Sequence, residues 1–300
     1  MTGPQTFLPK RTPGLVLHVI LFLLLLGAAG YFLFLAFQQP GGINLVLYLT
    51  GALIFLAGLP LLAYRGYALL HAHYDLERDG LRIRWGLRKL DIPLSEVEWV
   101  RPVEDLQIPL KLPAFSMPGA ILGNGQHPDL GTVEFIGSSA DNLVIVAAMD
   151  QVVILSPDEK NDFIQRFNRT IEMGTLSPIK PLSARPAVFL RSVFTDRLAR
   201  LTIPLGFGLW FLLLILVSIV IPGRTEISLG YDAVGVPLAS VPASRMLILP
   251  IIGIFLYAFG LIGGAYLFQK EESKPVSQLM WAGGVLTPIL LLIAALIFII

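Results

Sequence analysis

Few side chains in this sequence have the types and spacing that chemistry requires. His71 and His73 are two residues apart, a spacing that can place two zinc ligands on one strand face, but no third or fourth ligand is evident. Gly123-Asn124-Gly125 lacks the later glycine and the lysine of a phosphate-binding loop. The chain has no cysteine, no Gly-x-Ser-x-Gly elbow and no His-Glu-x-x-His pair. We therefore predict no catalytic, cofactor-binding or metal-binding residues, and a chain that is not an enzyme.

A small basic patch is the first candidate for binding. Arg82 and Arg84 share one face of a predicted strand, and Arg88 and Lys89 begin the next strand. The patch could attract an anionic lipid headgroup, or it could be a solvated face opposite an apolar core. Residues 71–172 hold ten Lys or Arg and sixteen Asp or Glu, a net charge of −6, and an anionic membrane surface repels such a domain. We therefore disfavour phosphoinositide binding, and we also expect no nucleic-acid partner.

A second basic group lies in a Pro-containing connector of residues 175–200. Arg191, Arg197 and Arg200 recur at roughly helical spacing among apolar residues. This composition fits a basic amphipathic helix that lies in the membrane interface. The same charges could also act only as topology signals. The two interpretations are compatible, and these arginines are the candidate membrane-interface residues.

Residues 106–130 combine apolar side chains with several prolines and glycines. An exposed apolar loop of this size usually marks a contact surface. Its candidate contact residues are Leu110, Leu112, Phe115, Met117, Ile121 and Leu122. The loop could cover a sheet edge, touch the membrane or dock on a partner, and the three alternatives stay open.

Five long apolar segments are the elements that must position these groups. Hydrophobic residues make up 55% of the 300 residues and charged residues only 14%, against about a quarter charged in soluble domains. A helix of about 20 apolar residues crosses a hydrocarbon core. Five segments reach this length without Asp, Glu, Lys or Arg: residues 15–37, 43–64, 201–221, 246–268 and 279–300. The first is too long for a signal-peptide core, so we predict a retained anchor and five transmembrane helices.

Positive charges near these predicted helices are distributed unevenly. With a cytoplasmic N-terminus, ten Lys or Arg lie inside and only Arg224 and Arg245 lie outside. Because cytoplasmic flanks are enriched in Lys and Arg, we predict a multi-pass protein of the cell membrane with a two-helix hairpin at residues 1–70 and a three-helix region at residues 201–300. The N-terminus and the intervening domain are then cytoplasmic, and the C-terminus lies on the opposite side.

Residues 71–174 have the pattern of a small β-rich domain. Alternating residues around Asp79-Gly80 predict a hairpin, since both residues tolerate the positive φ of a type I′ turn. Further strands are predicted at residues 88–93, 95–103, 132–137, 142–148 and 151–155. Ser156 and Glu159 fit the capping box of an amphipathic helix, with Pro157 at its first position. About seven strands closed by one helix predict a small β-barrel, and the whole chain is then an α+β membrane protein.

This order of elements resembles a pleckstrin-homology (PH) fold. Residues 74–86 and 92–97 are similar to the opening of bacterial PH domains in membrane proteins. The Pro-Gly-rich segment 112–119 and the Ser-Pro-Asp-Glu run at 156–159 resemble one subfamily of them. Such domains usually have no assigned ligand, so the resemblance implies a fold rather than a function. Residues 201–300 resemble a family of bacterial membrane segments of unknown function, although Gly230 stands where that family usually has a histidine.

Two functions are compatible with this organisation. The favoured hypothesis is a non-enzymatic scaffold or regulator in the lipid bilayer, whose PH-like domain, inserted between helices two and three, contacts a protein partner or another copy of the chain. It rests on the acidic domain and on the absence of catalytic groups. The alternative is a component of a small-molecule or lipid transporter that uses the five-helix bundle, which requires a polar cavity between the helices.

Overall fold

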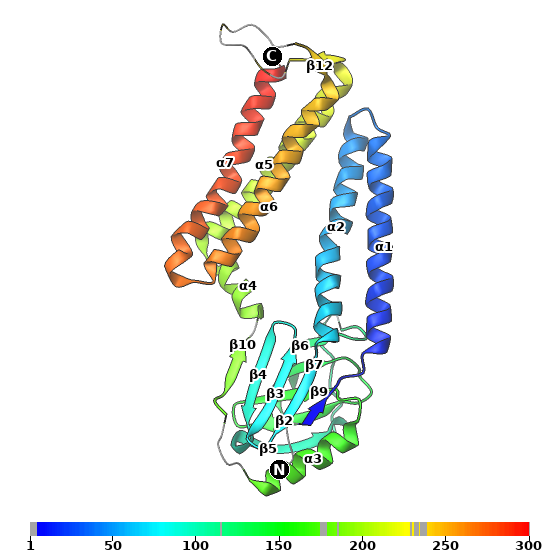
Figure 1. The fold of residues 1–300 in the computed structure, drawn as a ribbon, viewed down its shortest axis with the longest axis vertical. Coiled ribbons are helices and arrows are strands. Elements are labelled where there is room, and N and C mark those ends of the chain that lie inside the picture. Colours follow the sequence, from blue (N-terminus) through cyan, green and yellow to red (C-terminus); the bar gives the residue numbers. More distant parts are fainter. Residues whose placement is uncertain are drawn as a thin grey trace. The chain divides into compact units, whose positions relative to one another are not determined.

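The computed structural model describes residues 5–114, 116–174, 179–184, 186–228, 230, 234 and 239–299 (Figure 1). By its internal contacts the chain divides into two compact units. The first unit comprises residues 1–26 and 57–186, and the second comprises residues 27–56 and 187–300.

Five helices among the described residues are long and apolar enough to cross a membrane. They are α1 (Thr12–Phe37), α2 (Ile43–Leu70), α5 (Arg197–Val220), α6 (Ile248–Phe268) and α7 (Lys274–Ile299). They coincide with the five predicted segments, because a long apolar run satisfies its backbone groups within lipid only as a helix. The prediction of five such helices is confirmed, and the chain has the composition of a multi-pass membrane protein.

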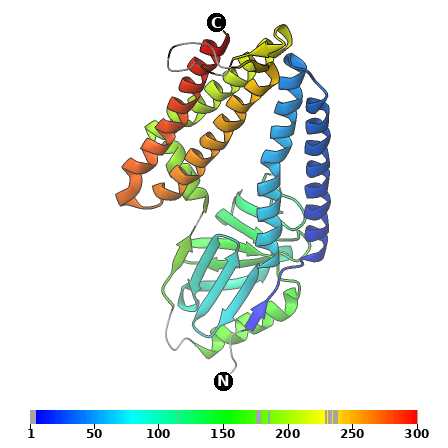
Figure 2. The same ribbon diagram turned by 45° about the horizontal axis from the view of Figure 1, so that its top comes forward.

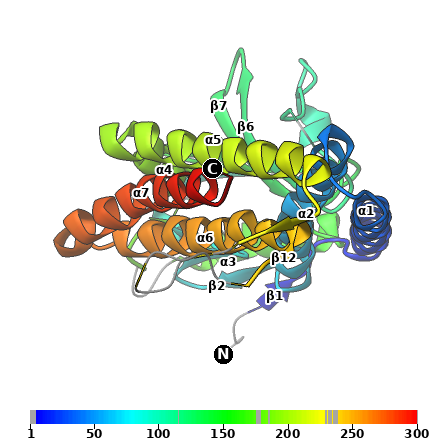
Figure 3. The same ribbon diagram turned by 90° about the horizontal axis from the view of Figure 1, so that it is seen from above.

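In the second unit, α5, α6 and α7 run side by side (Figures 1 and 3). Small residues allow their close approach: a Cβ on Gly206 would lie 2.6 Å from the carbonyl oxygen of Gly284. The indole Nε1 of Trp210 donates to the Pro250 carbonyl oxygen at 2.7 Å and adds a polar contact between helices. Gly283, in contrast, has open space around it. Short elements complete this unit: α4 (Pro186–Thr195), β11 (Glu226–Ile227), β12 (Val241–Pro242) and single 3₁₀ turns at Ile221–Gly223, Ala243–Leu247 and Glu271–Ser273.

The first sheet of the first unit has the antiparallel order β1-β2-β3-β4-β10. Its strands are β1 (Gln5–Phe7), β2 (His73–Glu77), β3 (Gly80–Trp85), β4 (Arg88–Pro93) and β10 (Leu182–Ala184). Glu77 pairs with Gly80, so the predicted hairpin exists. Its turn is formed by Arg78 and Asp79, whereas Gly80 is the first residue of β3 and has no positive φ, so the predicted role of Gly80 in the turn is wrong. The two outer strands come from segments far apart in the sequence, and Figure 2 shows β1 beside β2. The N-terminal segment and the connector therefore supply the two edge strands of this sheet, β1 and β10.

The second sheet has the order β5-β8-β9-β7-β6. Its strands are β5 (Val97–Pro102), β6 (Ile121–His127), β7 (Gly131–Gly137), β8 (Val144–Ala148) and β9 (Gln151–Leu155), with 3₁₀ turns at Leu94–Glu96 and Val103–Asp105 on either side of β5. β7 and β9 pair in parallel, whereas the other neighbours are antiparallel. The structure thus has two sheets around a common core, and the closed barrel of a PH fold is not confirmed.

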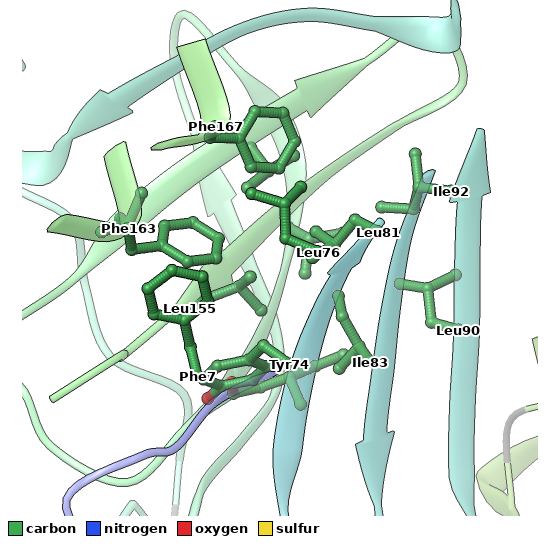
Figure 4. Packing of buried hydrophobic residues seen from close by; sticks show 14 of the residues in the cluster. Phe7, Tyr74, Leu76, Leu81, Ile83, Leu90, Ile92, Leu155, Phe163 and Phe167 are labelled. Atoms are coloured by element: carbon green, nitrogen blue, oxygen red, sulfur yellow. The ribbon is translucent and has the colours of Figure 1, made fainter. Parts of the chain in front are cut away.

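The core between the sheets is closed by α3 (Lys160–Met173), as Figure 4 shows. Phe163 and Phe167 of α3 are fully buried against side chains of both sheets, and Phe7 of β1 meets Phe163 edge to face at 5.0 Å. This pairing is the favoured geometry for aromatic rings. Below, the β domain means β2 to β9 with α3.

Two sequence predictions are wrong in this domain. Ser156 does not cap the helix: α3 begins at Lys160, and the Ser156 hydroxyl instead accepts a hydrogen bond from the Ser138 amide at 2.6 Å. Residues 121–127, predicted as part of a loop, form β6. Position 125 favours glycine because a Cβ there would come within 2.9 Å of the Phe135 ring. A strand with such glycines shows no alternation of apolar and polar side chains.

Candidate functional site

The N-terminal end of α1 and the C-terminal end of α2 pack into the core of the β domain. α2 continues almost directly into β2. Ala68 and Leu69 near the end of α2 are buried in the same cluster as the strands, and Leu15 of α1 packs against it. A helix that shares a core with a domain cannot rotate independently without exposing apolar surface. The β domain is thereby fixed to these ends of α1 and α2.

Polar and close contacts reinforce this junction. The Arg11 guanidinium donates to the Ala72 carbonyl oxygen at 2.5 Å. The Tyr64 hydroxyl oxygen accepts a hydrogen bond from the Leu87 amide at 3.0 Å. Gly86, next to Leu87, has φ +56°, and a Cβ there would lie 2.7 Å from the Tyr64 hydroxyl. The turn between β3 and β4 therefore needs glycine both for its backbone conformation and for its contact with α2.

Residues 117–119, in the middle of the predicted contact loop, lie against the same ends of α1 and α2. Gly119 has φ +86°, and a Cβ there would lie 2.5 Å from the Gly14 Cα of α1. The Gly119 amide donates to the Ser138 carbonyl oxygen at 2.7 Å, and Arg65 of α2 donates to the Met117 sulfur at 3.6 Å. A cavity of about 330 Å³ remains beside this contact, lined by Lys10, Leu112, Ser116, Ser139 and Asp141 among others. Part of the loop thus joins the helices to the β domain.

The six candidate contact residues have different environments. Ile121 is buried, and Leu110 packs against the same cluster. Met117 is half-buried, whereas Leu112 and Leu122 are exposed. Phe115 lies outside the described residues. The five that the structure describes therefore do not form one exposed surface.

Residues 106–112 are a mostly exposed stretch of the loop, in which Leu106 and Leu110 are half-buried. Ile108, which the sequence reasoning did not select, is 40% exposed. One cleft of about 480 Å³ is lined by Glu104, Leu106, Leu110, Leu112 and Leu143 among others, and another of about 490 Å³ by Ile108, Lys111, Gln126, His127 and Pro128 among others. We call residues 106–112 with these two clefts the contact segment.

The electrostatics of this segment are governed by local pairing. Glu104 accepts a hydrogen bond from the Lys160 ammonium at 2.7 Å, and this bond holds the pKa of the Glu104 carboxyl below its ordinary value. His127 on the other side has both ring nitrogens engaged, with the Ile108 carbonyl at 3.1 Å and the Asp129 amide at 3.2 Å. Glu104 and His127, two of the polar residues in these clefts, thus already have partners within the domain.

The predicted basic patch is largely neutralised within the domain. Arg88 binds the Glu134 carboxylate with two hydrogen bonds of 2.7 and 2.9 Å, and both side chains are nearly buried. Arg82 pairs with Glu77 at 2.9 Å, and Arg84 pairs with Asp91. Lys89 is exposed. Three of the four residues therefore already have carboxylate partners.

The three arginines proposed for the membrane interface lie on two helices. Arg191 is exposed on α4, and Arg197 and Arg200 are exposed in the first turn of α5. Asp196 separates the helices, and its carboxylate accepts a hydrogen bond from the Ala199 amide at 2.9 Å as the N-cap of α5. The predicted run is therefore divided between two helices: Arg191 lies on α4, whereas Arg197 and Arg200 belong to the start of α5. The position of these residues in a membrane interface stays a prediction.

The two candidate zinc ligands point to backbone partners. Nδ1 of His71 lies 2.9 Å from the Tyr67 carbonyl oxygen, and Nδ1 of His73 lies 2.8 Å from the His71 carbonyl oxygen. Among the described residues, no three His, Asp or Glu side chains are grouped as metal ligands would be. These histidines fit local structural roles.

Comparison with known proteins agrees with the arrangement of the β domain. Residues 72–171 match the family model described as "Bacterial PH domain". No curated protein and no solved structure matches the chain. The matched range begins just after α2 and ends within α3, so it covers the β domain, which is called the PH domain below.

Proposed function

We propose that the protein is a membrane-anchored, non-catalytic scaffold or regulator whose PH domain binds a protein partner or a second copy of the chain at the cytoplasmic membrane face. The observation that carries this proposal is the exposed apolar contact segment on a domain whose core continues into α1 and α2. A domain fixed in this way holds a binding surface at constant orientation to the adjoining ends of α1 and α2.

The charge of the PH domain supports a protein ligand rather than a lipid headgroup. The domain carries a net charge of −6, and three of the four residues in its basic patch have carboxylate partners. Phosphate recognition needs cations that are available to the ligand. An apolar surface of exposed aliphatic side chains is instead typical of protein contacts.

The alternative of a transporter has less support. The second unit contains a cavity of about 480 Å³. Its lining is almost entirely apolar, with Gln39 and Ser244 among the few polar residues. Transport sites within membranes are usually marked by ionisable or polar groups, so this cavity favours no transported substrate.

A photo-crosslinking experiment tests the proposal in cells that express the full chain. Ile108→p-benzoylphenylalanine places the crosslinker on the contact segment. Met149→p-benzoylphenylalanine is the matched control, since Met149 is also apolar, 66% exposed and on the PH domain, in the turn between β8 and β9. We expect a discrete protein adduct, or a crosslinked dimer, from position 108 and none from position 149.

Two results would contradict the proposal. Adducts with lipid alone from position 108 would assign the contact segment to the membrane. The same adducts from both positions would mean that exposure, rather than the contact segment, determines what is captured.

A further inference from the structure

The strand β6 lies at an open edge of the second sheet of the PH domain. The sheet order β5-β8-β9-β7-β6 leaves β5 and β6 at its two edges. Among the described residues, the backbone of β6 pairs only with β7. Leu122, Gly123, Asn124 and Gln126 of this strand are exposed. The outer edge of β6 therefore presents backbone N–H and C=O groups that pair with no strand the structure describes.

One face of β6 is already covered within the chain, but its edge is not. A Cβ on Gly123 would lie 3.3 Å from the Pro113 Cβ, and a Cβ on Gly125 would lie 3.4 Å from the Lys111 carbonyl oxygen. Alternate residues of a strand share one face, so the end of the contact segment lies over the odd-numbered face of β6. A further strand could thus pair with the edge of β6 without displacing the contact segment.

The other three sheet edges of the first unit have features that oppose such pairing. β1 and β10 are only three residues long. β5 carries Glu98 and Arg101, ends at Pro102 and has a register shift between Val97 and Trp99. Short length, charge, proline and bulges all keep an edge strand from pairing with another chain. β6 has seven residues and contains no Asp, Glu, Lys, Arg or Pro, so it is the edge suited to strand addition.

The charge of the PH domain favours a second copy as the added strand. Each copy of the domain carries a net charge of −6, so two copies repel unless their contact lies at an uncharged segment. β6 is such a segment, and every copy presents it. Antiparallel pairing of two identical strands is a two-fold symmetric contact, the commonest symmetry of protein oligomers. When residues 121–127 pair along their full length, Asn124 lies opposite Asn124 of the second copy, and Leu122 lies opposite Gln126.

We propose that two copies of the chain associate by antiparallel pairing of β6 with β6, which joins their two five-stranded sheets into one continuous sheet. This inference rests on the proposed function, because it takes a second copy as the protein that the PH domain binds. It goes further by placing the contact on the edge of β6. A partner that bound the contact segment alone would leave this edge unpaired.

Cysteine crosslinking of the full chain in isolated membranes tests the pairing, since the chain has no cysteine of its own. Asn124→Cys places the thiols of two copies opposite each other, where paired Cα atoms are about 4.5 to 5.5 Å apart and a disulfide can form. Asp150→Cys, in the exposed turn between β8 and β9, is the matched control. With copper phenanthroline as oxidant, we expect a disulfide-linked dimer from position 124 and little from position 150. No dimer from position 124, or equal yields from both positions, would overturn the pairing.

Two charge variants, each combined with Asn124→Cys, separate pairing from folding. Leu122→Lys/Gln126→Lys places lysine opposite lysine at two points of the contact, and the dimer yield should fall about fivefold or more. Leu122→Lys/Gln126→Glu changes the same positions but places lysine opposite glutamate. Its yield should stay within about twofold of Asn124→Cys alone. Equal yields from the two charge variants would contradict antiparallel pairing of β6 with β6.

The crosslinker at Ile108 distinguishes a failure of this inference from a failure of the proposed function. Protein adducts from position 108 without a dimer through position 124 would overturn the pairing and leave the proposed function in place. A dimer through position 124 with lipid adducts alone from position 108 would support the pairing and overturn the contact segment. Mixed disulfides of Asn124→Cys with a different protein, in place of a dimer, would overturn the second copy as the partner of β6.

Discussion

The Tyr74 hydroxyl joins the two sheets of the PH domain. Tyr74 on β2 donates to the Ile136 carbonyl oxygen on β7 at 2.8 Å, and the side chain is fully buried. Tyr74→Phe keeps the ring and removes this bond, so the free energy of unfolding should fall by about 1–2 kcal/mol. Chemical unfolding of the full chain in detergent, followed by tryptophan fluorescence, measures the change. Tyr67→Phe, at an exposed position, is the control and should leave the midpoint unchanged.

The same residue predicts how stability depends on alkaline pH. Burial raises the pKa of the Tyr74 phenol far above its ordinary value of 10.0, although hydrogen bonds with Ser156 partly offset this. Above about pH 10 the unfolded chain loses this proton while the folded chain retains it. The contribution of Tyr74 is therefore complete below that pH and declines as the pH rises. Tyr74→Phe should show a shallower loss of stability between about pH 9.5 and 11, and an unchanged slope would contradict the assignment.

Single residues also show that the sequence could not predict which side chains pair across the two sheets. Arg88 and Lys89 are adjacent in the sequence and were assigned to one patch. Yet Arg88 is nearly buried against Glu134, which is 46 residues away on the other sheet, while Lys89 is exposed. Alternation along one strand identifies its face, but not which carboxylate of a distant strand lies opposite. For the same reason Ile108 could not be separated from Leu110.

At the scale of elements, β1 extends the PH domain beyond the residues that match its family. β1 pairs with β2, and Phe7 fills the core beside Phe163, although the match begins at residue 72. Phe7→Ala should destabilise the domain by about 3 kcal/mol, near the lower limit for buried Phe because a short terminal strand can detach. Hydrogen exchange of the β2 amides should become faster. Leu8→Ala, 46% exposed, is the matched control, and equal exchange in both variants would contradict a role for β1 in the core.

The elements that could be predicted are those with strong local signals. The five apolar helices were predicted because their length determines them, and the β2–β3 hairpin was predicted because apolar and polar residues alternate on both sides of its turn. β6 was missed because its glycines serve contacts with other segments, as at Gly125 against Phe135. β1 and β10 are three residues long and exist only through pairing with β2 and β4. A local pattern cannot reveal a strand that depends on a distant neighbour.

At the scale of the whole molecule, charge is separated between the PH domain and the remainder of the chain. Residues 71–172 carry −6, and the other residues carry twelve basic and five acidic side chains, a net charge of +7. The positive charges flank the apolar helices, where they orient the chain. The negative charges predominate on the domain, and if it faces an anionic leaflet we expect repulsion between the two.

The orientation that follows from this charge pattern can be tested directly, because the chain has no cysteine of its own. Asp150→Cys lies in the exposed turn between β8 and β9, and Arg224→Cys is exposed just after α5. A membrane-impermeant maleimide should label Arg224→Cys in spheroplasts and Asp150→Cys only in inverted vesicles, since ten basic residues predict a cytoplasmic domain. The reverse pattern would contradict the orientation. Labelling of both positions from the same side would contradict a membrane crossing by α5, the one long apolar helix that the structure describes between them.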